Sequence, residues 1–479
     1  MAGTGSWSRR RLNECGGQRH HASDSQRRNR MTTLDILEFG AIGDGITNDA
    51  AAVQAAIDAC AASGGGRVLV PSGRVFVIGS IMLKSDVELH LERGAVLDGS
   101  PRAEDYTERF RVSALSSGQI SDDSEQTYIL IGARDAHNIA ITGAGTVRGG
   151  GRHFIESDTG YIYRCPNTRP FTVFFIHCED VTLRDATFTD AGLLCIRLTG
   201  VDRAVISGIR IDTDLKYPNV DGIDLDRCRQ VRISDCEISS GDDAISLKTC
   251  EEFPEYGPTE DIVITNCTLQ STSSAIVVGV DAVSDIRNVV VSNCVIRSSH
   301  RGLSVNLGQE GDFENILFSD CIVETRHFAE DWWGHGEPIY VSAYPWHDRV
   351  GQIRNVRFRN ILARSETGVY ISASGADRIR GVVLENVRVE LDRWSSWPGG
   401  EYDRRPFDSG TDLYPHRISG FHIDTATDVT LRGCEVVWGS RPEEFSHAVE
   451  AIDVDGLDIE GFRGIGAHPD DEAIRVHRR

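Results

Sequence analysis

Two short acidic segments are spaced so that their carboxylates could meet. The first reads Asn219-Val-Asp221 and the second Gly241-Asp242-Asp243, and each is followed by apolar residues at every second position. When these apolar residues are aligned, Asp221 falls opposite Asp243, with Asp242 beside them. If each segment is a turn leading into a strand, and the strands are neighbours in a parallel sheet, the aligned aspartates come about 5 Å apart. Carboxylates this close repel each other, and such clusters are typical of acid/base catalysis or of a cation site.

The three carboxylates suit inverting hydrolysis of a glycosidic bond. That reaction uses a protonated acid on one side of the bond and a carboxylate that activates water about 6.5–9.5 Å away on the other. Asp221 and Asp243 are too close to oppose each other, but they can hold one water together. Asp242 is the predicted acid, because two like charges beside it raise its pKa. Two other interpretations stay open: aspartates that only satisfy turn backbone, and a Ca²⁺ site.

The rest of the chain repeats short apolar segments that would position these turns. Segments such as Val231-Arg-Ile-Ser-Asp recur at intervals of roughly 20 to 30 residues, which is typical of a solenoid. We therefore predict an all-β fold, a right-handed parallel β-helix, which is a solenoid of about ten coils. Residues 48–62 have helical spacing and are predicted to cap its N-terminal end. One slot of the repeat holds a cysteine in several coils, which predicts an inward ladder of small side chains: Cys236, Cys267, Cys294, Cys321 and Cys434.

Composition and charge narrow the location and the partners. The formal net charge of -22 disfavours nucleic acid and anionic membrane as partners, and no apolar run approaches the roughly 20 residues of a membrane span. Residues 1–30 lack the apolar region of a signal peptide and are predicted to be a disordered leader. We expect a cytoplasmic protein whose 12 cysteines are thiols. Residues 31–479 are predicted to form one catalytic domain with loop insertions at 323–350 and 391–425; its oligomeric state is not predicted.

From roughly Leu34 to Ser440 the sequence resembles glycoside hydrolase family 28, the polygalacturonase family. The resemblance rests on Phe39-Gly-Ala-Ile-Gly-Asp-Gly and Arg169-Pro-Phe, and above all on the two acidic segments, which match the family's Asn-Thr-Asp and Gly-Asp-Asp motifs. It implies a β-helix and single-displacement hydrolysis with inversion. It also implies that Asp242 is the acid and that Asp221 and Asp243 activate the water.

Two further motifs of that family are not matched. Where the family has Gly-His-Gly, this sequence has Ser273-Ser-Ala, and where it has Arg-Ile-Lys, this sequence has Ser304-Val-Asn. In the family these basic residues hold the carboxylate of galacturonate, so a neutral sugar such as rhamnose is an alternative substrate. Arg301 is predicted to replace the missing cation, and a structural ion pair between Arg301 and Glu337 is the alternative.

Extending the register along the same face predicts a substrate groove. Its rows lead from the acidic turns toward the insertion at 326–340, where Trp333 is predicted to stack on a sugar ring and close one end. The predicted substrate-binding residues are Asn219, Asp224, Lys248, Ser274, Arg301, Ser304, Asn306, Glu337, Trp333 and Tyr340.

The predicted function is a glycosidase, exo-acting on pectin-derived oligosaccharides of galacturonate or rhamnogalacturonan type, without metal or cofactor. The alternatives are a neutral-sugar hydrolase, a β-helix polysaccharide lyase and a non-catalytic carbohydrate-binding β-helix. A lyase needs Ca²⁺ and a strongly basic side chain, and the chain has few lysines to offer: Lys84, Lys216 and Lys248. A binding protein would give the aspartate cluster no purpose.

Overall fold

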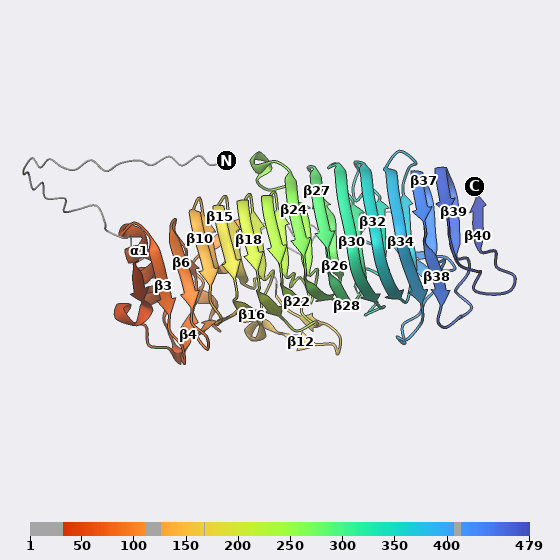
Figure 1. Cartoon of the computed structure of the whole chain (residues 1–479). Coiled ribbons are helices and arrows are strands. Elements are labelled where there is room, and N and C mark those ends of the chain that lie inside the picture. The colour runs from red at the N-terminus through yellow and green to blue at the C-terminus, as the bar shows by residue number, and fades with distance from the viewer. Residues whose placement is uncertain (1–31, 112–125, 167, 331, 407–412) are drawn as a thin grey trace, which may run out of the picture.

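The described chain winds into a long stack of coils. The computed structural model describes residues 32–111, 126–166, 168–330, 332–406 and 413–479. The stack runs from the helix α1 at one end to the strand β40 at the other (Figure 1). Most strands belong to one 36-stranded sheet in which successive coils pair in parallel. The predicted right-handed parallel β-helix is therefore confirmed, whereas the predicted leader lies outside the described residues.

The strands of successive coils stack into three ladders. The ladder that carries the acidic turns is here called the site face. It consists of β5 (Ile81–Met82), β9 (Gln126–Arg134), β14 (Phe171–Ile176), β17 (Ile196–Thr199), β20 (Ile223–Asp226), β23 (Ile245–Thr249), β26 (Ser274–Ala282), β29 (Arg301–Leu307), β31 (Ile339–Ala343), β33 (Val369–Ala373), the first parts of β37 (Phe421–Arg432) and β39 (Val449–Glu460), and β40 (Ile474–His477).

The other two ladders close each coil. The second consists of β1 (Thr33–Asp35), β3 (Gly66–Val70), β6 (Val87–Leu91), β10 (His137–Thr142), β15 (Glu179–Arg184), β18 (Asp202–Ser207), β21 (Arg229–Ser234), β24 (Thr259–Thr265), β27 (Ile286–Ser292), β30 (Phe313–Thr325), β32 (Ile353–Ser365), β34 (Ile379–Leu391) and the later parts of β37 and β39. The third consists of β2 (Asp44–Asn48), β4 (Val75–Ile78), β7 (Val96–Gly99), β11 (Thr146–Arg148), β16 (Thr187–Thr189), β19 (Arg210–Asp212), β22 (Glu237–Ser240), β25 (Thr268–Ser271), β28 (Val295–Ser299), the ends of β30, β32 and β34, and β38 (Glu435–Trp438).

A few elements stand outside the coils. The helix α1 (Ala50–Ala62) packs Val53, Ile57 and Cys60 onto the first coils, as predicted for a cap. Short antiparallel pairs are formed by β8 (Arg109–Arg111) with β9, by β12 (Ser157–Asp158) with β13 (Tyr163–Arg164), and by β35 (Glu401–Asp403) with β36 (Leu413–Pro415). Single 3-10 turns occur at η1 (Ile36–Phe39), η2 (Ala103–Asp105), η4 (Gly151–Phe154) and η5 (Pro254–Tyr256). None of the helices in the described ranges has the length and apolar character needed to cross a membrane.

The predicted cysteine ladder lies inside the coils. Cys236, Cys267, Cys294, Cys321 and Cys434 are all buried and carry free thiols. In the slot before the cysteine, Asp235, Asn266, Asn293 and Asp320 have positive φ angles of 54° to 58°. Asparagine and aspartate tolerate this left-handed conformation better than other non-glycine residues, which explains their recurrence at that turn.

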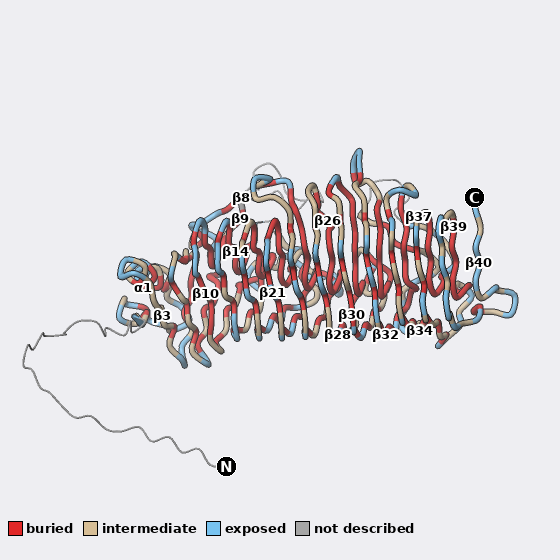
Figure 2. The backbone as a smooth tube through the Cα atoms, turned by 45° about the horizontal axis from the view of Figure 1, so that its top comes forward, coloured by how far each residue is buried: buried red, intermediate tan, exposed pale blue. Residues whose placement is uncertain are grey.

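Burial differs between the ladders, and this difference locates the site. Strands of the second ladder alternate buried and exposed residues, as in β21 and β24. In contrast, every residue of β23, β26, β29 and β31 on the site face is buried (Figure 2). Something must therefore cover the outer side of this face.

Two insertions provide that cover from β29 onward. Insertion 1 (326–338) lies between β30 and β31, and insertion 2 (392–420) lies between β34 and β37 and carries the β35–β36 hairpin. Both fall within the predicted segments 323–350 and 391–425; the remaining residues of those segments belong to the coil strands β30, β31, β34 and β37 and to the connection after β31.

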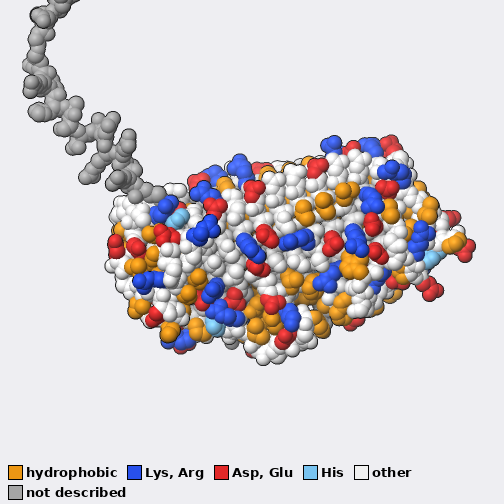
Figure 3. Space-filling view, turned by 60° about the horizontal axis from the view of Figure 1, so that its bottom comes forward, with side chains coloured by type: hydrophobic (Ala, Val, Ile, Leu, Met, Phe, Trp, Pro, Cys, Tyr) orange, Lys and Arg blue, Asp and Glu red, His pale blue; other side chains and the backbone are white. Residues whose placement is uncertain are grey.

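Charge is dispersed where coils meet solvent. On the face shown in Figure 3, acidic and basic side chains are interspersed rather than segregated. Cross-coil ion pairs such as Arg67–Glu88 and Arg287–Glu260 are part of this pattern. The net negative charge thus does not gather into one patch on that face.

Candidate active site

The two acidic turns meet at neighbouring coils of the site face. Strands β20 and β23 pair in parallel with Ile223 opposite Ile245 and Leu225 opposite Leu247, which is the predicted register. One residue before the strands, the amide of Gly222 donates to the carbonyl of Asp243 at 2.8 Å. The carboxylates of Asp221, Asp242 and Asp243 are consequently close enough to influence one another's ionisation.

Glycines make the tight turns possible. A Cβ on Gly222 would lie 2.4 Å from the carbonyl oxygen of Ala244, and one on Gly241 would lie 2.2 Å from that of Tyr217. Both approaches are too close for any side chain. Asn219 has a φ of 56°, a left-handed conformation that asparagine tolerates. The residue types of both motifs are therefore dictated by backbone packing as well as by chemistry.

Asp242 is the most accessible of the three aspartates, and backbone donors fix its side chain. Its Oδ1 accepts from the amide of Asp243 at 2.9 Å and its Oδ2 from that of Asn219 at 3.2 Å. Burial, together with the negative charge of Asp243, raises the pKa of Asp242 to about 7. The carboxyl group is thus suited to carry a proton near neutral pH.

The other two aspartates are held by different partners. Asp243 Oδ1 accepts from the amide of Ser274 at 2.8 Å, and burial raises the pKa of Asp243. Asp221 Oδ2 lies 3.1 Å from Nζ of Lys248. Burial and the neighbouring Asp224 raise the pKa of Asp221, and the Lys248 ammonium opposes that rise.

Lys248 bridges two carboxylates beneath the site. Its Nζ lies 2.9 Å from Asp224 Oδ1 and 3.1 Å from Asp221 Oδ2. Burial alone would lower the pKa of Lys248, but the two carboxylates outweigh it and raise that pKa. This ammonium partly neutralises the acidic cluster, whereas the sequence suggested a substrate contact or a solvated charge for Lys248.

Arg301 lies in the predicted row but points under insertion 2. Its Nη2 donates to the carbonyl of Asp403 at 2.8 Å, and its Cζ lies 3.8 Å from the centre of the Tyr340 ring. Its Nε is 3.5 Å from Glu337 Oε2. The geometry matches the alternative of an ion pair with Glu337, and Asp403 is a partner that the sequence analysis did not foresee.

Asp403 and Arg405 tie the two insertions together. Asp403 Oδ2 accepts from the amide of Gly334 at 2.6 Å, and Arg405 Nη2 donates to the carbonyl of Trp332 at 2.7 Å. Arg405 also pairs with Asp403 at 2.8 Å. These contacts hold insertion 2 against insertion 1 above Arg301.

Several of the predicted substrate-binding residues do not line an open groove in this structure. The insertions pack onto the coils from Arg301 onward, and in the acidic coils Lys248 lies against Asp221 and Asp224. The exposed fraction therefore falls to 0–1% for five predicted substrate-binding residues: Asp224, Ser304, Asn306, Glu337 and Tyr340. A small exposed fraction is found for Lys248 (8%), Ser274 (5%) and Arg301 (2%), and for the aspartates Asp221 (4%) and Asp243 (8%). Asn219 and Trp333 are partly exposed.

One predicted row is also interrupted. Asp226 pairs with Lys248 and Gly279 with Asn306, as expected. Between β23 and β26, however, the register shifts after Leu247, so that Thr249 pairs with Ala282. Lys248 therefore does not pair with Gly279, and its side chain is free to turn back toward Asp221.

A buried arginine fills a possible metal site near the acidic turns. Asp226, Cys250 and Glu252 lie close enough to share a cation. Arg197 Nη2 already stands between them, 2.9 Å from Asp226 and 3.1 Å from Glu252. This guanidinium supplies the positive charge that a metal would bring.

Solved structures resemble the whole stack of coils. An exopolygalacturonase from Yersinia enterocolitica aligns with a TM-score of 0.66 at 19% identity, covering 93% of this chain and 78% of that one. An exopolygalacturonase from Thermotoga maritima aligns with a TM-score of 0.62 at 23% identity, covering 75% and 87%. At these identities the likeness shows the fold.

Sequence comparisons are more specific. A probable polygalacturonase of Vitis vinifera is 29% identical over 257 residues, which are 52% of this chain and 51% of that protein. An exo-poly-alpha-D-galacturonosidase of Dickeya chrysanthemi is 38% identical over 122 residues, 25% of this chain and 19% of that protein. The chain spans about half the length or less of the curated relatives it matches. The family model for glycosyl hydrolases family 28 matches residues 60–397, a stretch that makes up most of the chain and contains both acidic turns, and the chain therefore belongs to that family.

Proposed function

We propose that this protein hydrolyses glycosidic bonds by inverting single displacement, with Asp242 as the acid. The observation that supports this most directly is the meeting of three carboxylates at one edge of the site face, with the pKa of the most accessible one raised to about 7. A carboxyl group that is still partly protonated near neutral pH can donate to a leaving oxygen. Asp221 and Asp243 accept the proton of the attacking water.

The reaction is a single step in this scheme. Asp242 gives its proton to the glycosidic oxygen while the bond from that oxygen to the anomeric carbon breaks. A water held by Asp221 and Asp243 attacks the anomeric carbon from the opposite side, and its proton passes to one of these carboxylates. Lys248, 3.1 Å from Asp221, favours the ionised form that the base needs.

We further propose a pectin-derived, galacturonate-type substrate and exo action. Two of the similar proteins named above are exopolygalacturonases and a third is an exo-poly-alpha-D-galacturonosidase. Insertion 1 supports a wall at one end: Trp333 stands edge-on to Trp346, whose ring packs on Val277 and Val280 of β26. A neutral sugar stays the second candidate, because Arg301 is already engaged by Asp403 and Glu337. A cytoplasmic location stays a prediction.

Stereochemistry tests the proposed reaction. The protein is incubated with oligosaccharides of galacturonate, rhamnogalacturonan and neutral sugars, and new reducing ends are followed by NMR. We expect the first-formed end to have the configuration opposite to that of the bond cleaved. Retained configuration, an unsaturated UV-absorbing product, or no cleavage of any of these glycans would each overturn the proposal.

Product length tests exo action separately. On long polygalacturonate we expect monomer or one short product from the start, with viscosity falling slowly relative to the reducing ends released. An early mixture of oligomers would instead show that Trp333 and Trp346 do not close the site.

The pH profile tests the assignment of the acid. Because the pKa of Asp242 is raised to about 7, kcat should fall as the pH rises through about 7 and the acid loses its proton. The profile of initial rates from pH 4 to 9 on the best substrate checks this. A rate that stays constant up to pH 9 would contradict Asp242 as the acid.

A further inference from the structure

A second cluster of ionisable side chains lies farther along the site face. The row that contains Ser304 and Tyr340 continues through Tyr370 to His422 on β37 and Glu450 on β39. His422 is six coils beyond Asp224, which corresponds to about 29 Å at the usual strand spacing. The cluster is therefore separate from the acidic turns.

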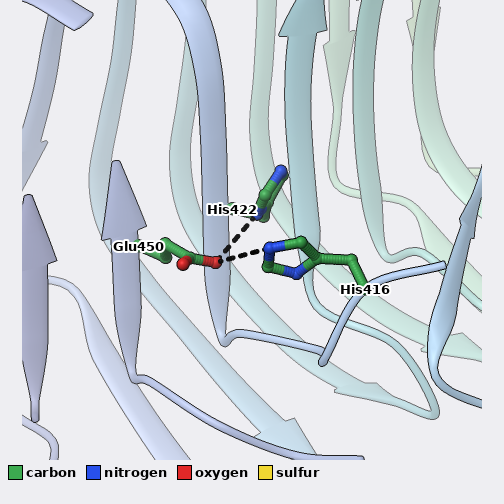
Figure 4. Close-up of side chains that lie close together, drawn as sticks. All are labelled: His416, His422 and Glu450. Carbon is green, nitrogen blue, oxygen red and sulfur yellow. Dashed lines mark ion pairs between the residues drawn. The ribbon is translucent and has the colours of Figure 1, made fainter. Parts of the chain in front are cut away.

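Insertion 2 completes this cluster. His416 directly follows the β35–β36 hairpin, and its ring faces the same carboxylate as the ring of His422 (Figure 4). Glu450 Oε2 lies 3.5 Å from His416 Nε2 and 3.4 Å from His422 Nδ1. All three atoms are within 4.8 Å of one another. In a tetrahedral zinc site the metal–ligand bonds are about 2.0–2.1 Å long, which places two ligand atoms about 3.4 Å apart. The nitrogen–oxygen distances in this cluster therefore suit ligands that share one metal ion.

The buried ring of His422 has no hydrogen-bond partner within the described chain. Its side chain is 0% exposed, and neither ring nitrogen makes a hydrogen bond there, since the approach of Nδ1 to Glu450 lacks hydrogen-bond geometry. Buried polar atoms without partners are uncommon and costly. A cation bonded to Nδ1 would resolve one of the two unsatisfied atoms.

Groups around the cluster orient its ligand atoms. His416 Nδ1 lies 2.6 Å from the carbonyl oxygen of Arg417, so its N–H donates there and leaves the lone pair of Nε2 facing Glu450. The hydroxyl of Ser419 donates to Glu450 Oε2 at 3.3 Å. Metal-binding histidines usually show this arrangement, in which the second nitrogen is held by a carbonyl or carboxylate.

Among the residues that the structure describes, no lysine or arginine forms an ion pair with Glu450. Within the described residues its ion pairs are those with His416 and His422. The Asp226, Cys250 and Glu252 cluster differs, since Arg197 occupies it. Of the two clusters, the one around Glu450 is therefore the one in which no arginine stands between the candidate ligands.

We propose that His416, His422 and Glu450 bind one divalent transition-metal ion of the Zn²⁺ class, which fastens the β35–β36 hairpin to the coils. Two imidazoles and a carboxylate suit Zn²⁺ and its neighbours rather than Mg²⁺ or Ca²⁺. The partial exposure of His416 (22% of its side chain) leaves a side open to a water as fourth ligand. The same hairpin holds Asp403 over Arg301, so the ion also steadies the cover of the site face. The rows predicted from the sequence end before this cluster, the longest of them at Tyr340.

Direct metal binding tests the site. The full chain is stripped with a chelator and titrated with ZnCl₂ by calorimetry, and with CoCl₂ by visible spectroscopy. We expect one ion per chain, a Tm that rises with metal, and Co²⁺ bands of a four-coordinate site without thiolate charge-transfer absorption. That last readout separates this site from the buried cysteines.

Matched variants locate the ion. His416→Ala and Glu450→Gln should each weaken Zn²⁺ binding at least tenfold and abolish the metal-dependent rise in Tm. His416 lies outside the strands, so its variant should fold with the Tm of the metal-free protein. His137→Ala, at an exposed histidine of another ladder, should bind as the unaltered chain does. The absence of binding at 100 µM Zn²⁺, or full binding by His416→Ala and Glu450→Gln, would overturn the proposal.

Discussion

Asp242→Asn is expected to lower kcat by about 10³-fold, within the range that a general acid contributes. Asparagine keeps the shape of the side chain and can still accept from the amide of Asp243, but it has no proton to give to the leaving oxygen. KM should change little, because Asp242 touches the substrate mainly at the reacting oxygen. Initial rates at pH 5 to 6, where the acid of the unaltered protein is protonated, measure the effect most cleanly.

The same substitution should affect stability in a pH-dependent way. The pKa of Asp242 is raised in the folded state from 3.8 to about 7, so the stability that this group contributes is complete below about 4. It is lost as the pH rises toward 7. Asparagine does not titrate, and the free energy of unfolding of the variant should therefore improve relative to the parent over this range. At pH 4 the variant should be slightly less stable, because its amide cannot accept from the backbone N–H of Asn219.

Asp235→Asn is the matched control for Asp242→Asn. Asp235 occupies a left-handed turn slot that holds asparagine at 266 and 293 in later coils, so the fold accepts either residue there. Activity and pH dependence of stability should both match those of the parent. If Asp242→Asn kept full turnover, the assignment of the acid would fail, and Asp243 would be the next residue to test.

The sequence was sufficient to predict the coils and the meeting of the acidic turns. Apolar residues at every second position determine which side chains face inward, and a one-residue slip would turn Asp221 away from Asp243. The turn slots with aspartate or asparagine repeat for a local reason, their tolerance of positive φ. Local patterns of this kind are visible without any knowledge of distant contacts.

The cover of the site face could not be predicted in this way. The hydrogen bond from Arg301 to Asp403 joins residues 102 positions apart, and insertion 2 has no repeat that would place it. The His422–Glu450 pairing could have been predicted from the sequence, because the strand register that aligns Ser304 with Tyr340 continues to those residues. The position of His416 could not have been predicted in this way, since His416 belongs to an irregular connection.

Lys248→Met is expected to cost both stability and activity. Methionine has a similar length but no charge, so Asp221 and Asp224 lose their shared ammonium partner while remaining buried. Breaking a buried pair in this way typically costs about 3–5 kcal/mol. Activity should fall by about 10²-fold or more, because Asp221 then takes up a proton and no longer acts as a base toward water.

The pH dependence of this loss shows whether charge is its cause. Without Lys248 the pKa of Asp221 rises further, and a carboxylate with a raised pKa destabilises the folded state increasingly as the pH rises. The deficit in the free energy of unfolding, measured by urea denaturation, should therefore be larger at pH 8 than at pH 5. A deficit equal at both pH values would point to lost packing instead.

A variant of a surface lysine and a double variant serve as controls for Lys248→Met. Lys216→Met breaks a partly exposed pair with Asp158 and should cost about 1 kcal/mol or less. Adding Asp224→Asn to Lys248→Met removes one uncompensated carboxylate and should recover part of the stability. Activity should stay low, because Asp221 still lacks its counter-charge. If Lys248→Met alone were as stable and as active as the parent at pH 7, the ammonium would have no part in keeping Asp221 ionised, and the base would have to be assigned to Asp243 alone.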